Sequence, residues 1–298
     1  QYLGGAPVYN FGYELLAVAK EKNMRISEVV LLNETEQTGR TPEEVKNRLW
    51  DYYEVMVNSA TSAIEQPRDT MGMMIKGDAQ KMNKYMLSGN TISGDFMNKM
   101  MARALSCSEV NASMGRICAA PTAGACGILP AVTMTVAERF GKSRDEILDA
   151  LLVASGVGQI IVKNATVAGA EGGCQVECGS AAAMAAAASV VMAGGSDEQA
   201  LNASAIALKN VLGLVCDPVA GLVEVPCAKR NASQSANAIS AAEMSLAGIK
   251  SNIPFDECVE AMMKVGRMLP CQLRETAQGG LAVTPTGRKI DERLHPKN

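Results

Sequence analysis

The chain has 298 residues, of which 48% are hydrophobic and 20% are charged, and its formal net charge is -3 at pH 7. This length and composition fit a globular protein with a full hydrophobic core and exclude a disordered chain. The small net charge gives no electrostatic basis for binding nucleic acid or an anionic membrane surface, and the apolar stretches 148–162 and 180–195 are short for a membrane span.

Helix signals follow one another along the chain. Capping boxes, in which Ser or Thr is followed three residues later by Glu or Gln, begin at Thr41, Ser143 and Ser196. An almost pure Ala/Met/Val stretch then predicts a central buried helix, and Pro254 begins another. The predicted helices cover about residues 41–65, 143–162, 178–193, 196–212 and 254–270.

The expected fold class is all-α. Aromatic residues make up only 4% of the chain, and the alternating pattern that strands need is scarce. We expect a single large helical domain over residues 1–298, with a loose N-terminal lead-in at 1–12 and a C-terminal tail at 286–298. Loops rich in Gly and Pro separate the helices and are the expected places for chemistry. They cover residues 119–127, 168–173, 217–226 and 279–285.

Nine cysteines occur in a chain without a signal-peptide pattern at its start, so we expect a cytoplasmic protein with reduced thiols. Most cysteines in such a protein are small buried hydrophobes. We interpret Cys107, Cys258 and Cys271 in this way, because each lies in or beside a helical pattern.

Other cysteines lie in or beside the predicted loops. Cys174 and Cys178 form a Cys-x-x-x-Cys pair, and Cys216 and Cys227 lie at the two ends of one proline-bounded loop. Gly/Pro loops suit an iron–sulfur cluster, because the backbone must fold around a bulky inorganic core. Zinc accepts the same ligands but usually shows Cys-x-x-Cys pairs. The spacing alone leaves both metals, and free buried cysteine, open.

Two further stretches suggest ligand binding. Exposed backbone amides of the small residues at 119–127, ahead of a helix, form a seat for a carboxylate, although a tight helix crossing also needs glycine. Lys163, Asn164 and Glu171 lie in the stretch of chain that leads up to Cys174. Lys163 ends an apolar helix, so it also fits a side chain that reaches out to solvent.

Four motifs together resemble the iron–sulfur-dependent L-serine dehydratases, in the form of the separate α subunit of the two-subunit type. They occur in the family's order and cover nearly the whole chain. The motifs are Ala-Pro-Thr-Ala-Gly (120–124), Gly-Ala-Glu-Gly-Gly-Cys-Gln (169–175), Cys-Asp-Pro-Val-Ala-Gly-Leu-Val-Glu-Val-Pro-Cys (216–227) with Arg230-Asn231-Ala232, and Glu-Thr-Ala-Gln-Gly-Gly-Leu-Ala (275–282).

The resemblance implies a [4Fe-4S] cluster held by Cys174, Cys216 and Cys227, with one iron left open as a Lewis acid for the substrate. It implies a lyase that converts L-serine to pyruvate and ammonia without pyridoxal phosphate, as part of amino-acid degradation and gluconeogenesis. Some single-chain members end in a cysteine that reaches the open iron. The sequence here ends Arg293-Leu294-His295-Pro296-Lys297-Asn298, so we expect water or substrate at that position.

The substrate-binding candidates are the 120–124 loop and two polar side chains, and the catalytic candidates are an amine and a carboxylate. The only histidine is His295 near the end of the sequence, so the chain offers little for proton abstraction. The resemblance implies a β subunit that carries a Ser-Ser-Ser-His-Thr loop, and we expect it to complete the site in a heteromer of, for example, two α and two β chains. The substrate candidates are Pro121, Thr122, Ala123, Gly124, Asn164 and Arg230, and the catalytic candidates are Lys163 and Glu171.

Three other interpretations stay open. A desulfidase acting on L-cysteine would use the same open iron. A helical scaffold stapled by zinc would use Cys174, Cys178, Cys216 and Cys227, and a helical module without metal would use none of them. In the dehydratase interpretation Cys118, Cys126 and Cys178 are packing residues or thiols beside the cluster.

Overall fold

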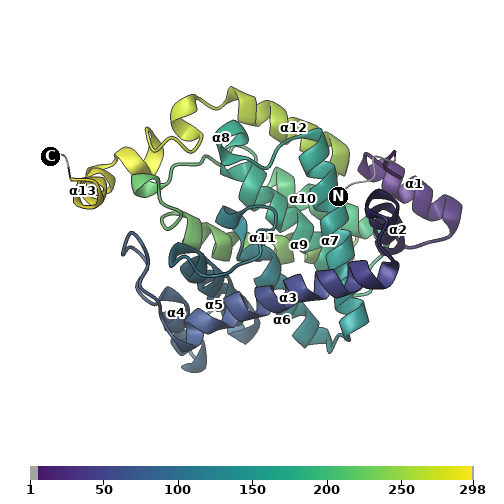
Figure 1. Cartoon of the computed structure of the whole chain (residues 1–298), viewed down its shortest axis with the longest axis horizontal. Coiled ribbons are helices and arrows are strands. Elements are labelled where there is room, and N and C mark those ends of the chain that lie inside the picture. The colour runs from purple at the N-terminus through teal and green to yellow at the C-terminus, as the bar shows by residue number, and fades with distance from the viewer. Residues whose placement is uncertain (1–5, 297–298) are drawn as a thin grey trace.

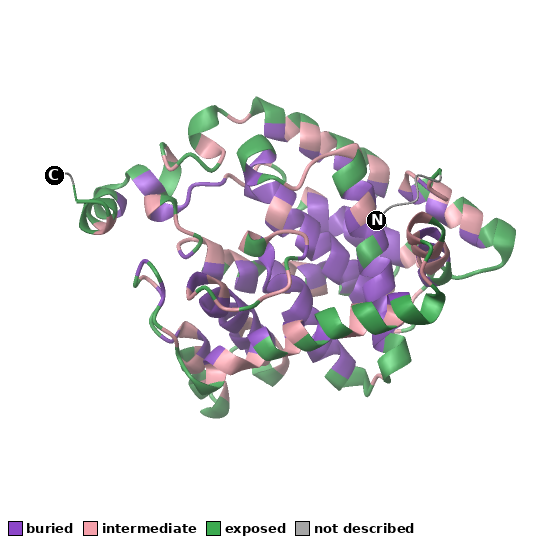
Figure 2. Cartoon of the chain, viewed as in Figure 1, coloured by how far each residue is buried: buried purple, intermediate pink, exposed green. Residues whose placement is uncertain are grey.

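The alanine-rich helix α9 (Ser180–Met192) lies at the centre of the fold, in the buried region of Figure 2. All but one of its residues are buried, and α6, α7, α10 and α11 pack around it. Small side chains allow these neighbours to approach closely. The buried helix predicted at 178–193 is therefore confirmed, with its regular α-helical part beginning at Ser180.

The computed structural model describes residues 6–296. These residues form α-helices joined by loops and short 3-10 and π-helical turns, contain no β-strand and share a hydrophobic core, which confirms the all-α prediction (Figure 1). The helices are α1 (Gly12–Lys22), α2 (Ile26–Thr38), α3 (Pro42–Glu65), α4 (Asp78–Leu87), α5 (Gly94–Ala112), α6 (Ile128–Phe140), α7 (Arg144–Asn164), α8 (Gly169–Gly172), α9, α10 (Asp197–Lys209), α11 (Cys227–Leu246), α12 (Phe255–Met268) and α13 (Pro285–Leu294).

The three predicted capping boxes are present. The side chains of Thr41, Ser143 and Ser196 each accept a hydrogen bond from the backbone N–H three residues later, at the starts of α3, α7 and α10. α10 ends at Lys209, a little earlier than the expected end at residue 212. Gly213, with a φ of +87°, lies in the turn that follows.

The C-terminal segment corrects an expectation. Residues 286–298 were expected to be a tail, but Pro285–Leu294 form α13. Thr284 Oγ1 accepts a hydrogen bond from the backbone N–H of Gly287 and caps this helix, and Arg293 Nη2 donates to the carbonyl of Gly72 at 2.9 Å. The last turn is therefore tied to a distant part of the chain.

The N-terminal segment and one loop also differ from expectation. Part of the expected lead-in at 1–12 lies outside the described residues, but Tyr9 is only 3% exposed and donates a hydrogen bond to Gln159 at 2.8 Å. That part of the segment is packed rather than loose. The expected loop at 168–173 contains the single turn of α8, and a π-helical turn (Gln175–Gly179) then leads into α9.

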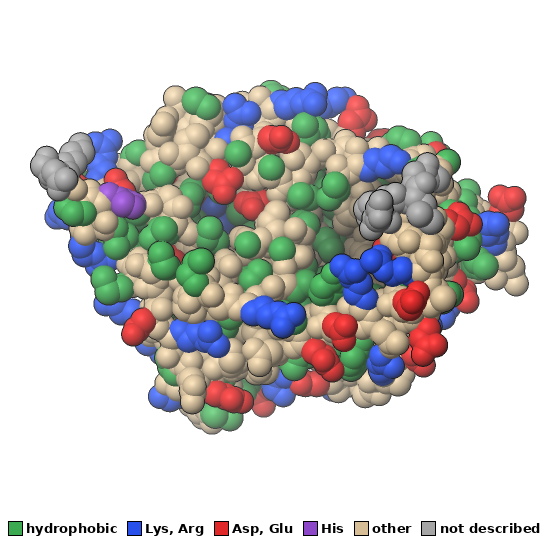
Figure 3. Space-filling model, in the orientation of Figure 1, with side chains coloured by type: hydrophobic (Ala, Val, Ile, Leu, Met, Phe, Trp, Pro, Cys, Tyr) green, Lys and Arg blue, Asp and Glu red, His purple; other side chains and the backbone are tan. Residues whose placement is uncertain are grey.

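Apolarity and charge distribution agree with the composition. By length and composition one stretch of the described residues, Gln175–Met192, is apolar enough to match a membrane span, but 89% of it is buried inside the protein, as in a core helix. On the face shown in Figure 3 acidic and basic side chains are interspersed. This surface shows no large field of one sign, as expected from the net charge of -3.

Candidate active site around three cysteines

Cys174, Cys216 and Cys227 lie at breaks in the helical structure. Cys174 precedes the π-helical turn, the backbone of Cys216 forms an isolated β-bridge with that of Arg274, and Cys227 is the first residue of α11. Cys174 and Cys216 are 4% and 5% exposed, and Cys227 is half-buried. Irregular backbone thus presents all three thiols from different segments.

The three thiols are close enough to affect one another's ionisation. Burial, and then the charge of Cys174, raise the pKa of Cys216, and the same causes raise the pKa of Cys227 to about 12. By contrast, the pKa of Cys174 is lowered, first by its contact with Cys178, whose sulfur lies 3.4 Å away, and also by the positive charge of Arg230. Cys174 is therefore the thiol most readily held as a thiolate, which is the form that binds metal.

Arg230 on α11 fixes the loop that carries Cys216. Its Nη1 donates to the carbonyl of Val215 at 2.8 Å and its Nη2 donates to Asp217 Oδ1 at 2.9 Å. Asp217 in turn accepts a bond from the backbone N–H of Leu281 at 2.7 Å. One buried ion pair therefore joins two of the predicted loops and places a cation beside the thiols.

The loop between Cys216 and Cys227 is anchored by a second acidic residue. Glu224 is 1% exposed, and its carboxylate accepts hydrogen bonds from Thr70 Oγ1 at 2.9 Å, the backbone N–H of Met74 at 3.0 Å and the backbone N–H of Gly72. These bonds compensate the burial of its charge. The loop is held rigidly although it contains little regular structure.

Glu177, in the π-helical turn between Cys174 and Cys178, is the functional candidate that sequence reasoning missed. Its Oε1 accepts a hydrogen bond from Thr122 Oγ1 at 2.9 Å, and its Oε2 lies 3.9 Å from Cys216 Sγ. Burial, and then the charge of Glu275, raise its pKa to about 7. One sequence signal was available, because Glu177 is the only charged residue between Glu171 and Asp197.

Glycines give Glu177 its space. A Cβ atom at Gly169 would lie 2.6 Å from Glu177 Oε2 and 3.2 Å from Glu275 Oε2, and a Cβ atom at Gly124 would lie 3.3 Å from Glu177 Oε1. The motifs at 120–124, 169–175, 216–227 and 275–282 thus meet at one carboxylate. Segments distant in sequence are joined there by tertiary packing.

The 120–124 loop is held against α11. Asn231 Nδ2 donates to the carbonyl of Gly124 at 2.7 Å, and Asn231 Oδ1 accepts from the backbone N–H of Gly127 at 2.9 Å. Beside it, a cavity of about 510 Å³ is lined in part by Ala120 and Pro121. The loop is therefore anchored at one end and borders open space at the other.

Comparison with known proteins decides the family. The family model described as serine dehydratase alpha chain matches residues 21–282. The probable L-serine dehydratase alpha chain of Bacillus subtilis (strain 168) is 47% identical, with 94% of this chain and 93% of that protein covered. The L-serine dehydratase alpha chain of Peptoniphilus asaccharolyticus is 50% identical, with 94% of this chain and 96% of that protein covered.

This chain belongs to the serine dehydratase alpha chain family. The L-serine dehydratase 1 of Escherichia coli (strain K12) is 35% identical over 91% of this α chain, which spans only 60% of that protein. The relatives named as alpha chains are therefore matched almost end to end, and the longer relative contains a further part.

The thiols of Cys174, Cys216 and Cys227 are the donor type that iron–sulfur clusters use. Among residues 6–296 no group of three or more His, Cys, Asp or Glu side chains is spaced to hold one metal ion, so the four-thiolate zinc interpretation has no geometric support. In a cluster each cysteine binds a different iron, so the sulfurs need not converge on one point. Arg274, which bridges to Cys216, also has a buried Nε without a partner in the described part of the chain.

Three candidates lie elsewhere in the α chain. Lys163 donates to Asn10 Oδ1, and Asn164 Nδ2 donates to the carbonyl of Asn10 at 2.7 Å, so both hold the N-terminal segment. Glu171 is exposed, and its side chain makes no hydrogen bond or ion pair with another described residue. The structure brings Thr122, Gly124, Arg230 and the cysteines together. Lys163, Asn164 and Glu171 make no hydrogen bond or ion pair with that group.

The remaining six cysteines differ in their surroundings. Cys107, Cys126 and Cys258 are buried packing residues, and Cys178 contacts Cys174 as a neighbouring thiol. Cys118 is partly buried and lines the cavity beside the 120–124 loop. The interpretation of Cys271 as a packing residue is wrong, because it is exposed in the 3-10 turn after α12. Pro270, which follows the end of α12, separates that turn from the helix.

Proposed function

We propose that this α chain is the cluster-bearing subunit of an L-serine dehydratase, which converts L-serine to pyruvate and ammonia. Loss of the α-proton and the hydroxyl group as water gives an enamine, which takes up water and releases ammonia. The relatives named as alpha chains support this substrate, because each is matched over nearly its whole length. The single observation that carries the proposal is the meeting of Cys174, Cys216 and Cys227 beside Arg230 and Glu177.

We infer that Cys174, Cys216 and Cys227 hold a [4Fe-4S] cluster. With three protein ligands, such a cluster supplies one iron with a free position, which acts as a Lewis acid toward a carboxylate or hydroxyl group. The chain's part is to present thiolates. Arg230 and Cys178 favour the thiolate of Cys174, and the Arg230–Asp217 pair orients the loop of Cys216.

The 120–124 loop is the proposed seat of the substrate. Its Thr122 hydroxyl is oriented by the hydrogen bond to Glu177, and Gly124 leaves room beside the same carboxylate. With a pKa of about 7, Glu177 holds or releases a proton at Oε2 near neutral pH. Lys163, Asn164 and Glu171 have weaker support, because none of them contacts this group.

We place the reaction in the cytoplasm, because all nine cysteines are free. A β subunit is the proposed partner. The longer Escherichia coli relative supports this, because the α chain accounts for only 60% of it.

Anaerobic reconstitution with iron and sulfide tests the cluster. We expect a brown protein that bleaches in air, with iron and sulfide contents that fall when Cys174, Cys216 or Cys227 is replaced by serine. Replacing the exposed Cys271 by serine is the matched control and should change neither content. A colourless protein containing zinc would contradict the cluster.

The substrate is tested on the same material by measuring pyruvate release. With the β subunit present, L-serine should be consumed faster than L-cysteine. Faster release from L-cysteine would instead identify a desulfidase, because the two substrates differ only in the leaving group.

A further inference from the structure

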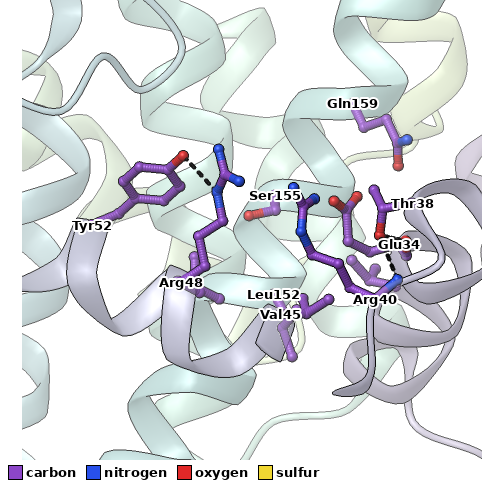
Figure 4. Close-up of a pocket in the computed structure, with 11 residues that line it drawn as sticks. Glu34, Thr38, Arg40, Val45, Arg48, Tyr52, Leu152, Ser155 and Gln159 are labelled. Atoms are coloured by element: carbon purple, nitrogen blue, oxygen red, sulfur yellow. Dashed lines mark hydrogen bonds between the residues drawn. The ribbon is translucent and has the colours of Figure 1, made fainter. Parts of the chain in front are cut away.

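A cavity of about 480 Å³ lies between α2, α3 and α7 and contains none of the cysteines (Figure 4). Its volume is in the range of small-molecule sites. The apolar side chains of Val30, Val45 and Leu152 line part of it and are buried. The other lining residues are mostly polar, and they include charged groups of both signs.

Two arginines with free N–H donors on their guanidinium groups line this cavity. Arg48 Nε donates to the hydroxyl of Tyr52 at 3.0 Å, and Arg48 Cζ lies 5.7 Å from the centre of that ring, which fixes the side chain. Its Nη atoms, and the whole guanidinium of Arg40, make no hydrogen bond or ion pair with another residue in 6–296. Figure 4 shows the two guanidinium groups on either side of Ser155.

A carboxylate without a partner lies in the same cavity. In Figure 4 the Glu34 carboxylate is beside the guanidinium of Arg40, but no ion pair or hydrogen bond joins it to a residue in 6–296; its charge acts on Arg48 only at longer range. Gln159 Oε1 accepts bonds from Tyr9 and from Asn33, which leaves its Nε2 free to donate. The negative charge of Glu34 and the positive charges of Arg40 and Arg48 line one cavity without forming ion pairs with each other. Such a lining suits a ligand that itself carries both a negative and a positive charge.

We propose that this cavity binds an α-amino acid zwitterion. Its carboxylate lies between Arg40 and Arg48, whose planar donors match carboxylate geometry, and its ammonium group is bound by Glu34. The apolar residues at 30, 45 and 152 receive its side chain. The proposal needs no cluster, so its failure and the failure of the proposed function are distinguishable.

Calorimetric titration of the full-length chain with L-alanine tests the site. L-alanine has both charges but no hydroxyl group to lose, so it is not consumed. We expect saturable binding of one molecule per chain. Arg40→Gln and Glu34→Gln should each weaken it by about tenfold or more, because each removes a charge-assisted hydrogen bond. Arg139→Gln, an exposed arginine without a partner among the described residues, is the matched control and should bind as the unchanged chain does.

Single-charge probes separate the possible outcomes. Acetate and methylammonium should each bind more weakly than L-alanine. Inorganic phosphate binding more tightly than L-alanine would identify a simple anion site and overturn the proposal. Absence of saturable L-alanine binding would also overturn it, as would binding that survives Arg40→Gln but is lost in Arg230→Gln, since the ligand would then occupy the cysteine site. Circular dichroism of each variant confirms that it is folded.

Discussion

Burial and the nearby charge of Glu275 raise the pKa of Glu177 to about 7, although the hydrogen bond from the Thr122 hydroxyl acts in the opposite direction. The folded state therefore binds a proton more tightly than the unfolded state, where the carboxyl has its usual pKa of 4.5. Stability is greatest below the unfolded pKa and is lost as the pH rises toward 7. Such an energetic cost at one residue is typical of functional sites.

This predicts a pH-dependent stability for the cluster-free chain under reducing conditions. Raising the pH from 5 to 7.5 should lower its free energy of unfolding by up to about 3 kcal/mol through Glu177. Glu177→Gln should flatten this dependence, because an amide cannot ionise. Glu171→Gln, at an exposed residue, is the control and should leave the profile unchanged. The measurement is denaturant unfolding at each pH, and identical profiles for all three proteins would contradict the assignment.

At the scale of elements, α9 shows why the scaffold depends on small side chains. Ala186 is 0% exposed, and α9 is surrounded by other helices. The same close packing brings the π-helical turn, and with it Cys174, to the ends of the neighbouring loops. Rigid helices thus position irregular segments that carry the functional residues.

Overpacking α9 should therefore be costly. Ala186→Leu is expected to lower the free energy of unfolding by about 1–3 kcal/mol, because added methyl groups have no space. Ala247→Leu, at the exposed end of α11, should change it by less than about 0.5 kcal/mol. Equal effects of the two variants in urea unfolding would argue against tight packing at α9.

The 120–124 loop gives a second prediction at this scale. Gly124→Val should abolish turnover while iron and sulfide contents stay unchanged, because the new side chain would crowd the Glu177 carboxylate from 3.3 Å. Gly124→Ala adds only the Cβ atom and should retain part of the activity. Full activity of the valine variant would show that the loop serves only packing.

At the scale of the whole molecule, the described part of the α chain brings no histidine side chain to the proposed site that could accept the α-proton. Its only histidine, His295, is exposed and hydrogen-bonded to Asp291 at 2.8 Å after α13. No contact joins it to the cysteine group in the described part of the chain. A partner that covers this group would both exclude water and bring a further proton carrier.

The cluster-loaded α chain alone should accordingly release pyruvate from L-serine far more slowly than the same protein mixed with the β subunit. Titrating β into a fixed amount of α should raise the rate until the two are equimolar. Full turnover by α alone at equal cluster content would refute the need for the partner.

Local sequence determined most of the elements. Capping boxes at Thr41, Ser143 and Ser196 act within one helical turn, so their helices were predictable to within a few residues. The motifs around the cysteines were predictable as well, because a resemblance depends on residue order alone. Two predictions were wrong: Cys271 is exposed rather than packed, and residues 285–294 form a helix rather than a tail. Burial, and the stability of a short terminal helix, both depend on contacts with residues far away in the sequence.

Only the tertiary structure decided which residues share a site. The sequence placed Lys163 and Glu171 close to Cys174 along the chain, whereas the fold turned Lys163 toward Asn10, left Glu171 in solvent and set Glu177 against Thr122, Cys216 and Gly169. Proximity in sequence fixes neither the direction of a side chain nor the burial that shifts its pKa. Those follow from the packing of segments that lie far apart in the chain.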